Sequence, residues 1–90
     1  MSVKVKISAV FQQATSGAKE ALVNCNTVGE CLTQVAKEYP PLEKMFFDEK
    51  NKLSGFLTVF VNEECVRDNL FDTPVKSGDE IFPVMIIEGG

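Results

Sequence analysis

One segment with the period of an amphipathic helix most restricts the fold of this chain. Thr27 precedes it, and Glu30 three residues later completes the pattern of a capping box. Pro40 and Pro41 follow the segment and cannot continue a ladder of backbone hydrogen bonds. The pattern predicts a helix over residues 27–39 with one apolar face that another element must cover. The apolar positions of that face are Val28, Cys31, Leu32, Val35, Ala36 and Tyr39.

The sequence before this helix alternates apolar and polar residues, which is typical of strands with one buried face. Residues 3–7 read VKVKI, and residues 21–25 alternate in the same way. Between them, residues 12–18 are polar and contain glycine. These patterns predict two strands joined as a hairpin, with 12–18 as the turn.

The sequence after the helix predicts further strands. Residues 41–54 are predicted to form a short helical turn and a charged loop, and FLTVFV at 56–61 is strongly β-prone. A brief strand at 65–67 and a last strand at about 80–87 complete the series. Pro83 lacks a backbone N–H, so we expect a bulge or an early loss of pairing there.

The predicted order of elements is therefore β-β-α-β-β-β in a single domain, residues 1–90. One helix with an apolar face must pack across a sheet with an apolar face. The predicted fold class is α+β, a β-grasp (ubiquitin-like) arrangement with a mixed four- to five-stranded sheet and one main helix. Its first and last strands are expected to pair at the centre of the sheet, with residues 87–90 forming a flexible C-terminal tail.

Charge and composition exclude several classes of function. The net charge of −4 argues against a nucleic-acid partner, which requires a basic surface. The chain has neither an apolar run long enough for a membrane span nor a signal-peptide pattern, so no membrane partner is expected and the cytoplasm is the expected location. Because the chain has no histidine, it cannot supply a cysteine–histidine or serine–histidine nucleophile pair.

The cysteines number three and show no C-x-x-C spacing. Neither a disulfide framework nor a zinc site is therefore predicted. Cys25, Cys31 and Cys65 are each interpreted as small, buried hydrophobic residues. No other pattern of metal ligands is visible.

The printed sequence ends in Gly89 and Gly90, directly after Glu88. Two readings are open: a frayed end, or a tail whose terminal carboxylate is the reactive group. Several motifs favour the second reading, because with the strand order they resemble the ThiS/MoaD family of ubiquitin-like sulfur carriers over nearly the whole chain. These motifs are NTVGECL, LTVFVNEECVRD, KSGDEI, a proline in the last strand and the terminal GG. The segment from Tyr39 to Arg67 looks like the longer, CysO-type members of the family.

The resemblance implies a specific chemistry for the last residues. A partner enzyme of the ubiquitin-activating type (MoeB/ThiF type) would use ATP and magnesium to adenylate the Gly90 carboxylate, which then becomes a thiocarboxylate. The chain would bind no cofactor itself. It would be a protein cosubstrate, or the small subunit of a synthase complex, and not an enzyme. A downstream synthase would accept the sulfur for molybdopterin, thiazole or cysteine synthesis, among which the sequence does not choose.

The sequence also predicts where partners bind. Phe60 and Phe82 should lie on the face of the sheet turned away from the helix, and aromatic residues are enriched at protein interfaces. Segment 41–54 folding over part of that face is the alternative. Glu88 is either a solvated charge or a contact with a basic channel mouth on the partner. Family members commonly carry two prolines and small residues before the glycines, whereas this chain has Ile86, Ile87 and Glu88.

Two other functions remain open. A ubiquitin-like modifier would begin with the same activation but would end in an isopeptide bond between Gly90 and a lysine. A β-grasp binding module would have a glycine tail without a role of its own. Deleting the tail separates this last reading from the other two.

Overall fold

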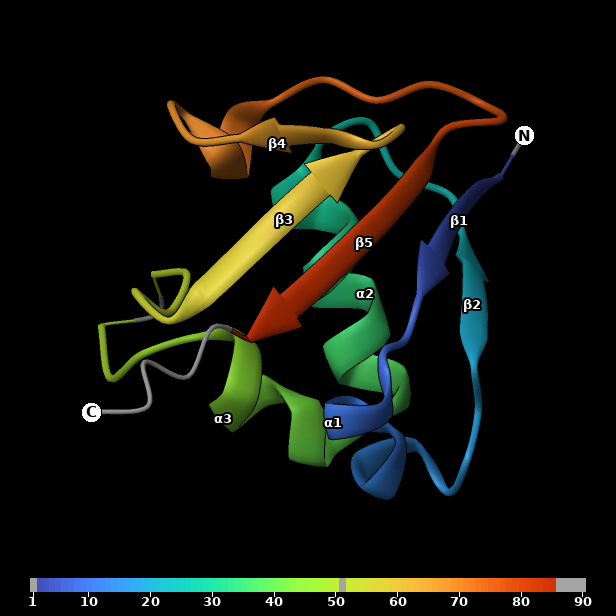
Figure 1. Cartoon of the computed structure of the whole chain (residues 1–90), viewed down its shortest axis with the longest axis vertical. Helices are drawn as coiled ribbons and strands as arrows, with labels where there is room; N and C mark the ends of the chain where they lie inside the picture. The colour runs from blue at the N-terminus through green and yellow to red at the C-terminus, as the bar shows by residue number, and fades with distance from the viewer. Residues whose placement is uncertain (1, 51, 86–90) are drawn as a thin grey trace.

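The structure is a computed structural model that describes residues 2–50 and 52–85 (Figure 1). The order of elements is β-α-β-α-α-β-β-β, with 3-10 turns at Gln13–Thr15, Pro40–Leu42 and Leu70–Asp72. The strands are β1 (Val3–Lys6), β2 (Glu20–Val23), β3 (Leu57–Val61), β4 (Glu64–Val66) and β5 (Glu80–Met85). The helices are α1 (Ala9–Gln12), α2 (Val28–Glu38) and α3 (Glu43–Phe46).

The five strands form one sheet in the order β2-β1-β5-β3-β4. The first and last strands pair in parallel at its centre, with Val5 opposite Ile81, and the other neighbours are antiparallel. Helix α2 crosses one face of this sheet (Figure 1). The predicted α+β arrangement, with a mixed sheet and one main helix, is confirmed.

The core lies between α2 and the sheet because both present apolar residues at their own period. Val3, Val5 and Ile81 point to this side from β1 and β5 and are at most 1% exposed. The predicted apolar positions of α2 are buried from Val28 to Ala36, and Tyr39 is partly buried at the helix C-cap. In the ranges 2–50 and 52–85 no helix has the length and hydropathy to cross a membrane.

The predicted helix is also confirmed in its start and its end. Thr27 is the N-cap, and its hydroxyl accepts a hydrogen bond of 3.2 Å from the backbone N–H of Glu30. The second half of the capping box differs from the expectation, because the Thr27 hydroxyl donates to the Glu30 carboxylate at 3.4 Å. The helix ends at Glu38, before Pro40 and Pro41.

The prediction of a hairpin turn over residues 12–18 is wrong in part, because the chain is helical from Ala9 to Thr15 before it turns. Phe11 explains the difference: it is fully buried, and its ring meets that of Phe46 edge to face at a centroid distance of 5.1 Å. Burying a large aromatic side chain makes a large contribution to the stability of the core. The chain thus fills the end of the core before β2 begins.

The segment after α2 packs into the same core. Leu42 and Phe46 are fully buried and belong to one cluster with the residues of α2. This burial anchors the segment beside α2, not over Phe82, which stays 36% exposed. Pro83 interrupts the sheet on one side only: the pairing between β1 and β5 ends at Ile81, whereas β3 pairs with β5 as far as Met85.

The interpretation of the cysteines is corrected by the structure. Cys25, after β2, and Cys31, in α2, form a disulfide with a Cα–Cα distance of 5.3 Å. Their spacing of six residues carries no disulfide signature in the sequence, and the two meet only because the chain reverses at the cap of α2. Cys65 lies exposed on β4 with a free thiol, so its interpretation as a buried residue is wrong.

Candidate docking face and C-terminal segment

The face of the sheet turned away from α2, here called the outer face, displays every second residue of the central strands. Phe60 on β3 lies opposite Phe82 on β5, and Thr58 lies opposite Val84. We call these four residues the aromatic patch. The burial pattern places their sequence neighbours, including Val59 and Ile81, in the core. The patch therefore follows directly from the alternation of side chains along β3 and β5.

The aromatic patch is open to solvent in the structure. Phe82 is 36% exposed and Phe60 is partly exposed. Both rings border a surface hollow whose other lining residues are polar: Lys6, Asn62, Glu63 and Glu80. Aromatic side chains inside a polar rim are the usual composition of a protein interface. The predicted placement of Phe60 and Phe82 on the face away from the helix is confirmed; their role in binding stays a prediction.

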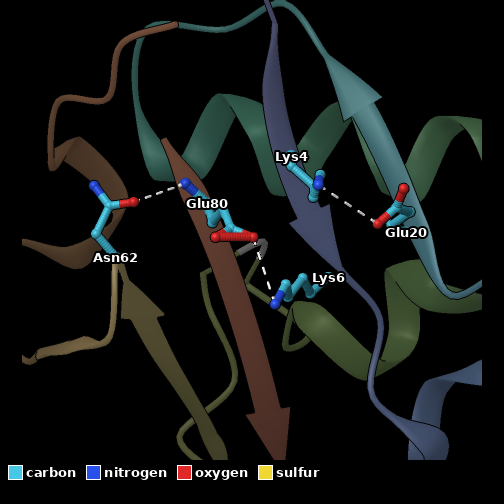
Figure 2. A network of polar contacts seen from close by, with 5 residues as sticks. All are labelled: Lys4, Lys6, Glu20, Asn62 and Glu80. Carbon is cyan, nitrogen blue, oxygen red and sulfur yellow. Dashed lines mark hydrogen bonds and ion pairs between the residues drawn. The ribbon is translucent and has the colours of Figure 1, made fainter. Parts of the chain in front are cut away.

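The other half of the outer face is charged but internally paired. Lys4 reaches Glu20 on β2 at 3.8 Å, and Lys6 reaches Glu80 on β5 at 3.4 Å. Figure 2 shows both lysines of β1 pointing at carboxylates of the neighbouring strands. Exposed pairs of this kind add little stability. Their effect is to balance the charge over β1 and its neighbours.

A hydrogen-bonded cluster closes the end of the sheet at which β5 begins. The Asn62 side chain accepts from the backbone N–H of Glu80 at 3.0 Å (Figure 2) and donates to the Asp79 carboxylate at 2.9 Å. The backbone N–H of Lys76 donates to the other Asp79 oxygen at 2.9 Å. The bond from Asn62 and then that from Lys76 hold the pKa of Asp79 below its usual value. This cluster fixes the turn between β3 and β4.

Strand β5 ends at the opposite end of the sheet. Met85, the last described residue of β5, lies opposite Leu57, the first residue of β3. The predicted site residues Glu88, Gly89 and Gly90 lie outside the described residues. Phe82 is three residues before Met85 on the same strand, but the Phe82 side chain lies on the outer face, whereas Met85 packs against the core.

The sequence reading missed part of this face. Val84 and Thr58 belong to the patch, and the alternation that identified Phe60 and Phe82 could have found them. Cys65 lies opposite Phe60 across the β3–β4 pair, which places it at the edge of the patch. Only the register of the turn at Asn62 and Glu63 reveals this neighbour.

A five-stranded mixed sheet with parallel central strands, crossed by one helix and open on its other face, defines a small ubiquitin-like β-grasp protein. Comparison with known families assigns it further. The ThiS family matches residues 5–90, and the chain belongs to this family. It is a sulfur carrier/ubiquitin-like small modifier family in which the similar proteins are small carrier or modifier proteins.

Individual relatives agree with this assignment. The chain is 31% identical, over the whole length of both chains, to a protein of Archaeoglobus fulgidus assigned as a sulfur carrier. It matches a chain in the crystal structure of the BexX/CysO complex of Amycolatopsis orientalis with 29% identity and a TM-score of 0.86, covering 98% of this chain and 99% of that chain. The solution structure of small archaeal modifier protein 1 from Methanosarcina acetivorans matches with 29% identity and a TM-score of 0.84, covering 99% and 96%.

Proposed function

We propose that this protein is a sulfur carrier whose Gly90 carboxylate is adenylated by a partner enzyme and converted to a thiocarboxylate. The observation that carries the proposal is the match to the ThiS family, which extends through Gly89 and Gly90. The similarity to the Archaeoglobus fulgidus protein, over the full length of both chains, supports it. In this role the chain is a cosubstrate, and the catalytic groups belong to its partners.

The terminal residue suits this chemistry. A C-terminal carboxyl has an ordinary pKa of about 3.3–3.7, so it is anionic at pH 7 and can attack the α-phosphate of ATP, which releases pyrophosphate. The carboxylate itself has no good leaving group. Adenylation supplies AMP as the leaving group, after which a sulfur nucleophile attacks the carbonyl carbon and releases AMP. The partner provides ATP and magnesium, since this chain has no glycine-rich nucleotide loop.

The tail supplies reach and a small cross-section. The five residues after Met85 can span at most about 17 Å when extended. Gly89 and Gly90 have no Cβ atom, so they fit a channel that excludes other residues. Glu88 stands at the point where such a channel would open, where we propose that it meets a basic group of the partner. The side-chain-free end thus lets the carbonyl carbon enter a closed active site.

The aromatic patch is the docking surface in this proposal. Two of its residues, Phe82 and Val84, belong to β5, the strand that precedes the tail, so a partner bound over Phe60 and Phe82 would hold the tail near its own active site. We propose an adenylyltransferase of the MoeB/ThiF type as the first partner and a sulfur-accepting synthase as the second. The Amycolatopsis orientalis relative, solved as the BexX/CysO complex, supports docking onto another protein.

The test uses the intact chain, candidate MoeB/ThiF-type enzymes from the same organism, ATP, magnesium and a sulfide source. Intact-mass spectrometry should show the exchange of one oxygen for one sulfur atom. Gly90→Ala should lower the rate of adenylation strongly, because its methyl group crowds the channel. Ala18→Gly, on the loop before β2, serves as the control for a general effect of substitution. Normal thiocarboxylation of Gly90→Ala would show that the channel argument is wrong.

A second candidate is a ubiquitin-like modifier. The similarity to small archaeal modifier protein 1 from Methanosarcina acetivorans favours it. Both functions share the activation step, so activation alone does not separate them. Conjugates of the chain to lysine side chains, detected as higher-mass species that retain Gly90 in an isopeptide bond, would favour the modifier. A thiocarboxylate without such conjugates would favour the carrier.

A further inference from the structure

We propose that Cys25 and Cys31 form a redox-active site that exchanges with small thiols and disulfides of the glutathione class. The two residues form a disulfide and their Cα atoms are 5.3 Å apart, within the range that a disulfide can bridge without moving the backbone. This site lies at the corner between β2 and α2. It is separate from the aromatic patch and the tail, and the proposal does not depend on the proposed function.

The two cysteine residues differ in exposure. Cys25 is partly exposed and lines a surface hollow beside Asn24, Asn26 and Lys76. Cys31 is fully buried in the core. Exchange of a disulfide requires a thiolate to reach one of its sulfurs. Because Cys25 is the more exposed residue, we assign its sulfur as the one attacked and Cys31 as the leaving group.

The surroundings also suit the leaving group. Cys31 lies near the N-terminus of α2, an 11-residue helix, where the helix dipole favours a negative charge. Lys76 adds a positive charge at the rim of the hollow. A thiolate that leaves more readily makes the disulfide easier to reduce. The helix dipole and Lys76 thus oppose the cost of forming a thiolate at the buried Cys31.

The reaction balances with a glutathione-class thiol as the reductant. A first thiolate attacks the Cys25 sulfur, forms a mixed disulfide and releases the Cys31 thiolate. A second thiolate attacks the sulfur of the bound thiol and releases the Cys25 thiolate, and both protein thiolates take up protons. Two small thiols thus become one small disulfide while the protein disulfide becomes two thiols. Oxidation by the small disulfide is the reverse.

The fold does not depend on this bond alone at the corner. The backbone N–H of Val28 donates to the Thr73 carbonyl at 2.9 Å, and that of Val75 donates to the Asn26 carbonyl at 2.9 Å. The Thr27 cap holds the helix start independently of the sulfurs. Reduction should therefore loosen the corner without unfolding the protein. The disulfide closes a short loop, so we expect the melting temperature of the oxidised form to exceed that of the reduced form by about 10 °C.

Cys65 provides an internal reference. It lies on β4, at the edge of the sheet opposite β2, and its thiol is free. The full chain is equilibrated in glutathione buffers graded from reducing to oxidising, quenched with acid, unfolded and alkylated. Intact-mass spectrometry should show a change from three alkyl groups to a single alkyl group or a single glutathione, on Cys65, and Cys65→Ser should change from two alkyl groups to none. Three alkyl groups in every buffer would overturn the proposal.

A second measurement separates a disulfide from two independent thiols. Cys25→Ser removes the accessible sulfur and leaves the buried Cys31 in place, so the variant should fold. It should lose the difference in melting temperature between oxidising and reducing buffers, whereas Cys65→Ser should keep it. The proposal is wrong if Cys25→Ser keeps the full difference, or if oxidation adds glutathione to Cys25 and leaves Cys31 free for alkylation.

Discussion

Ile81 and Phe82 are neighbours on β5, yet they lie in opposite environments. Ile81 is fully buried under α2, whereas Phe82 is 36% exposed on the outer face. Val59 and Phe60 repeat the contrast on β3, where Val59 is fully buried. Because side chains alternate along each strand, the sheet has one buried face and one exposed face. One face determines whether the domain folds, and we expect the other to determine what it binds.

The largest expected effect is on the buried side of this comparison. Ile81→Ala removes a fully buried side chain from the central strand and leaves a cavity. We expect the free energy of unfolding to fall by about 2–5 kcal/mol, measured by denaturant titration. Phe82→Ala, one residue further, should cost about 1 kcal/mol because its ring is already partly in solvent. Equal losses for the two variants would contradict the division between the faces.

The next prediction concerns the exposed side. Phe60→Asp places a charge in the aromatic patch and should weaken binding to the activating enzyme about 30-fold, the effect of losing a strong interface residue. Its circular dichroism spectrum should remain that of the folded protein. Titration by calorimetry measures the affinity.

A matched control lies on the charged half of the same face. Leu22 on β2 is 64% exposed, and Leu22→Asp makes the same chemical change outside the patch. Its effect on affinity should stay within about threefold. If Leu22→Asp weakens binding as much as Phe60→Asp, the docking surface is not confined to the aromatic patch.

A smaller effect on stability is expected at the turn after β3, which fixes the register between β3 and β4. Asn62 and Glu63 join β3 to β4, and both have positive φ, 49° and 73°. Two-residue hairpins of this kind prefer glycine at the second position. Glu63→Gly should therefore raise the free energy of unfolding by about 1 kcal/mol. Glu64→Gly, one residue later and inside β4, should lower it instead.

Most of the fold could be predicted from the sequence, because its strongest patterns come from residues that must be buried in the core. The apolar stripe of α2 and the alternation in β1 and β3 each have one way to bury their side chains, and the strand order followed from them. Phe11 was the exception. The segment from Ala9 to Thr15 is too short to show a helical period, so its helical turn depends on the tertiary contact between Phe11 and Phe46.

The candidate site was predictable in part for the same reason. Phe60 and Phe82 follow from alternation, whereas the neighbouring Cys65 depends on the register set by the Asn62–Glu63 turn. The disulfide between Cys25 and Cys31 could not be read from spacing, because it forms across a chain reversal. The contact depends on how the chain turns between β2 and α2, which the pattern of apolar and polar residues does not specify.

The smallest effect is expected at Asp79, in the hydrogen-bonded cluster at the start of β5. The Asp79 carboxylate accepts hydrogen bonds from Asn62 and Lys76, which lower its pKa from the ordinary value of 3.8. A carboxylate with a lowered pKa stabilises the folded state above its unfolded pKa, and this contribution is lost as the pH falls through the folded pKa. Asp79→Asn should therefore be less stable than the parent at pH 7. The difference in free energy of unfolding should shrink between about pH 5 and pH 2. Denaturant titrations of both proteins across this range measure it, with Asp68→Asn, at an exposed residue, as the control. If the difference in free energy of unfolding stays constant with pH, the charge of Asp79 does not contribute to stability, and only the geometry of its hydrogen bonds does.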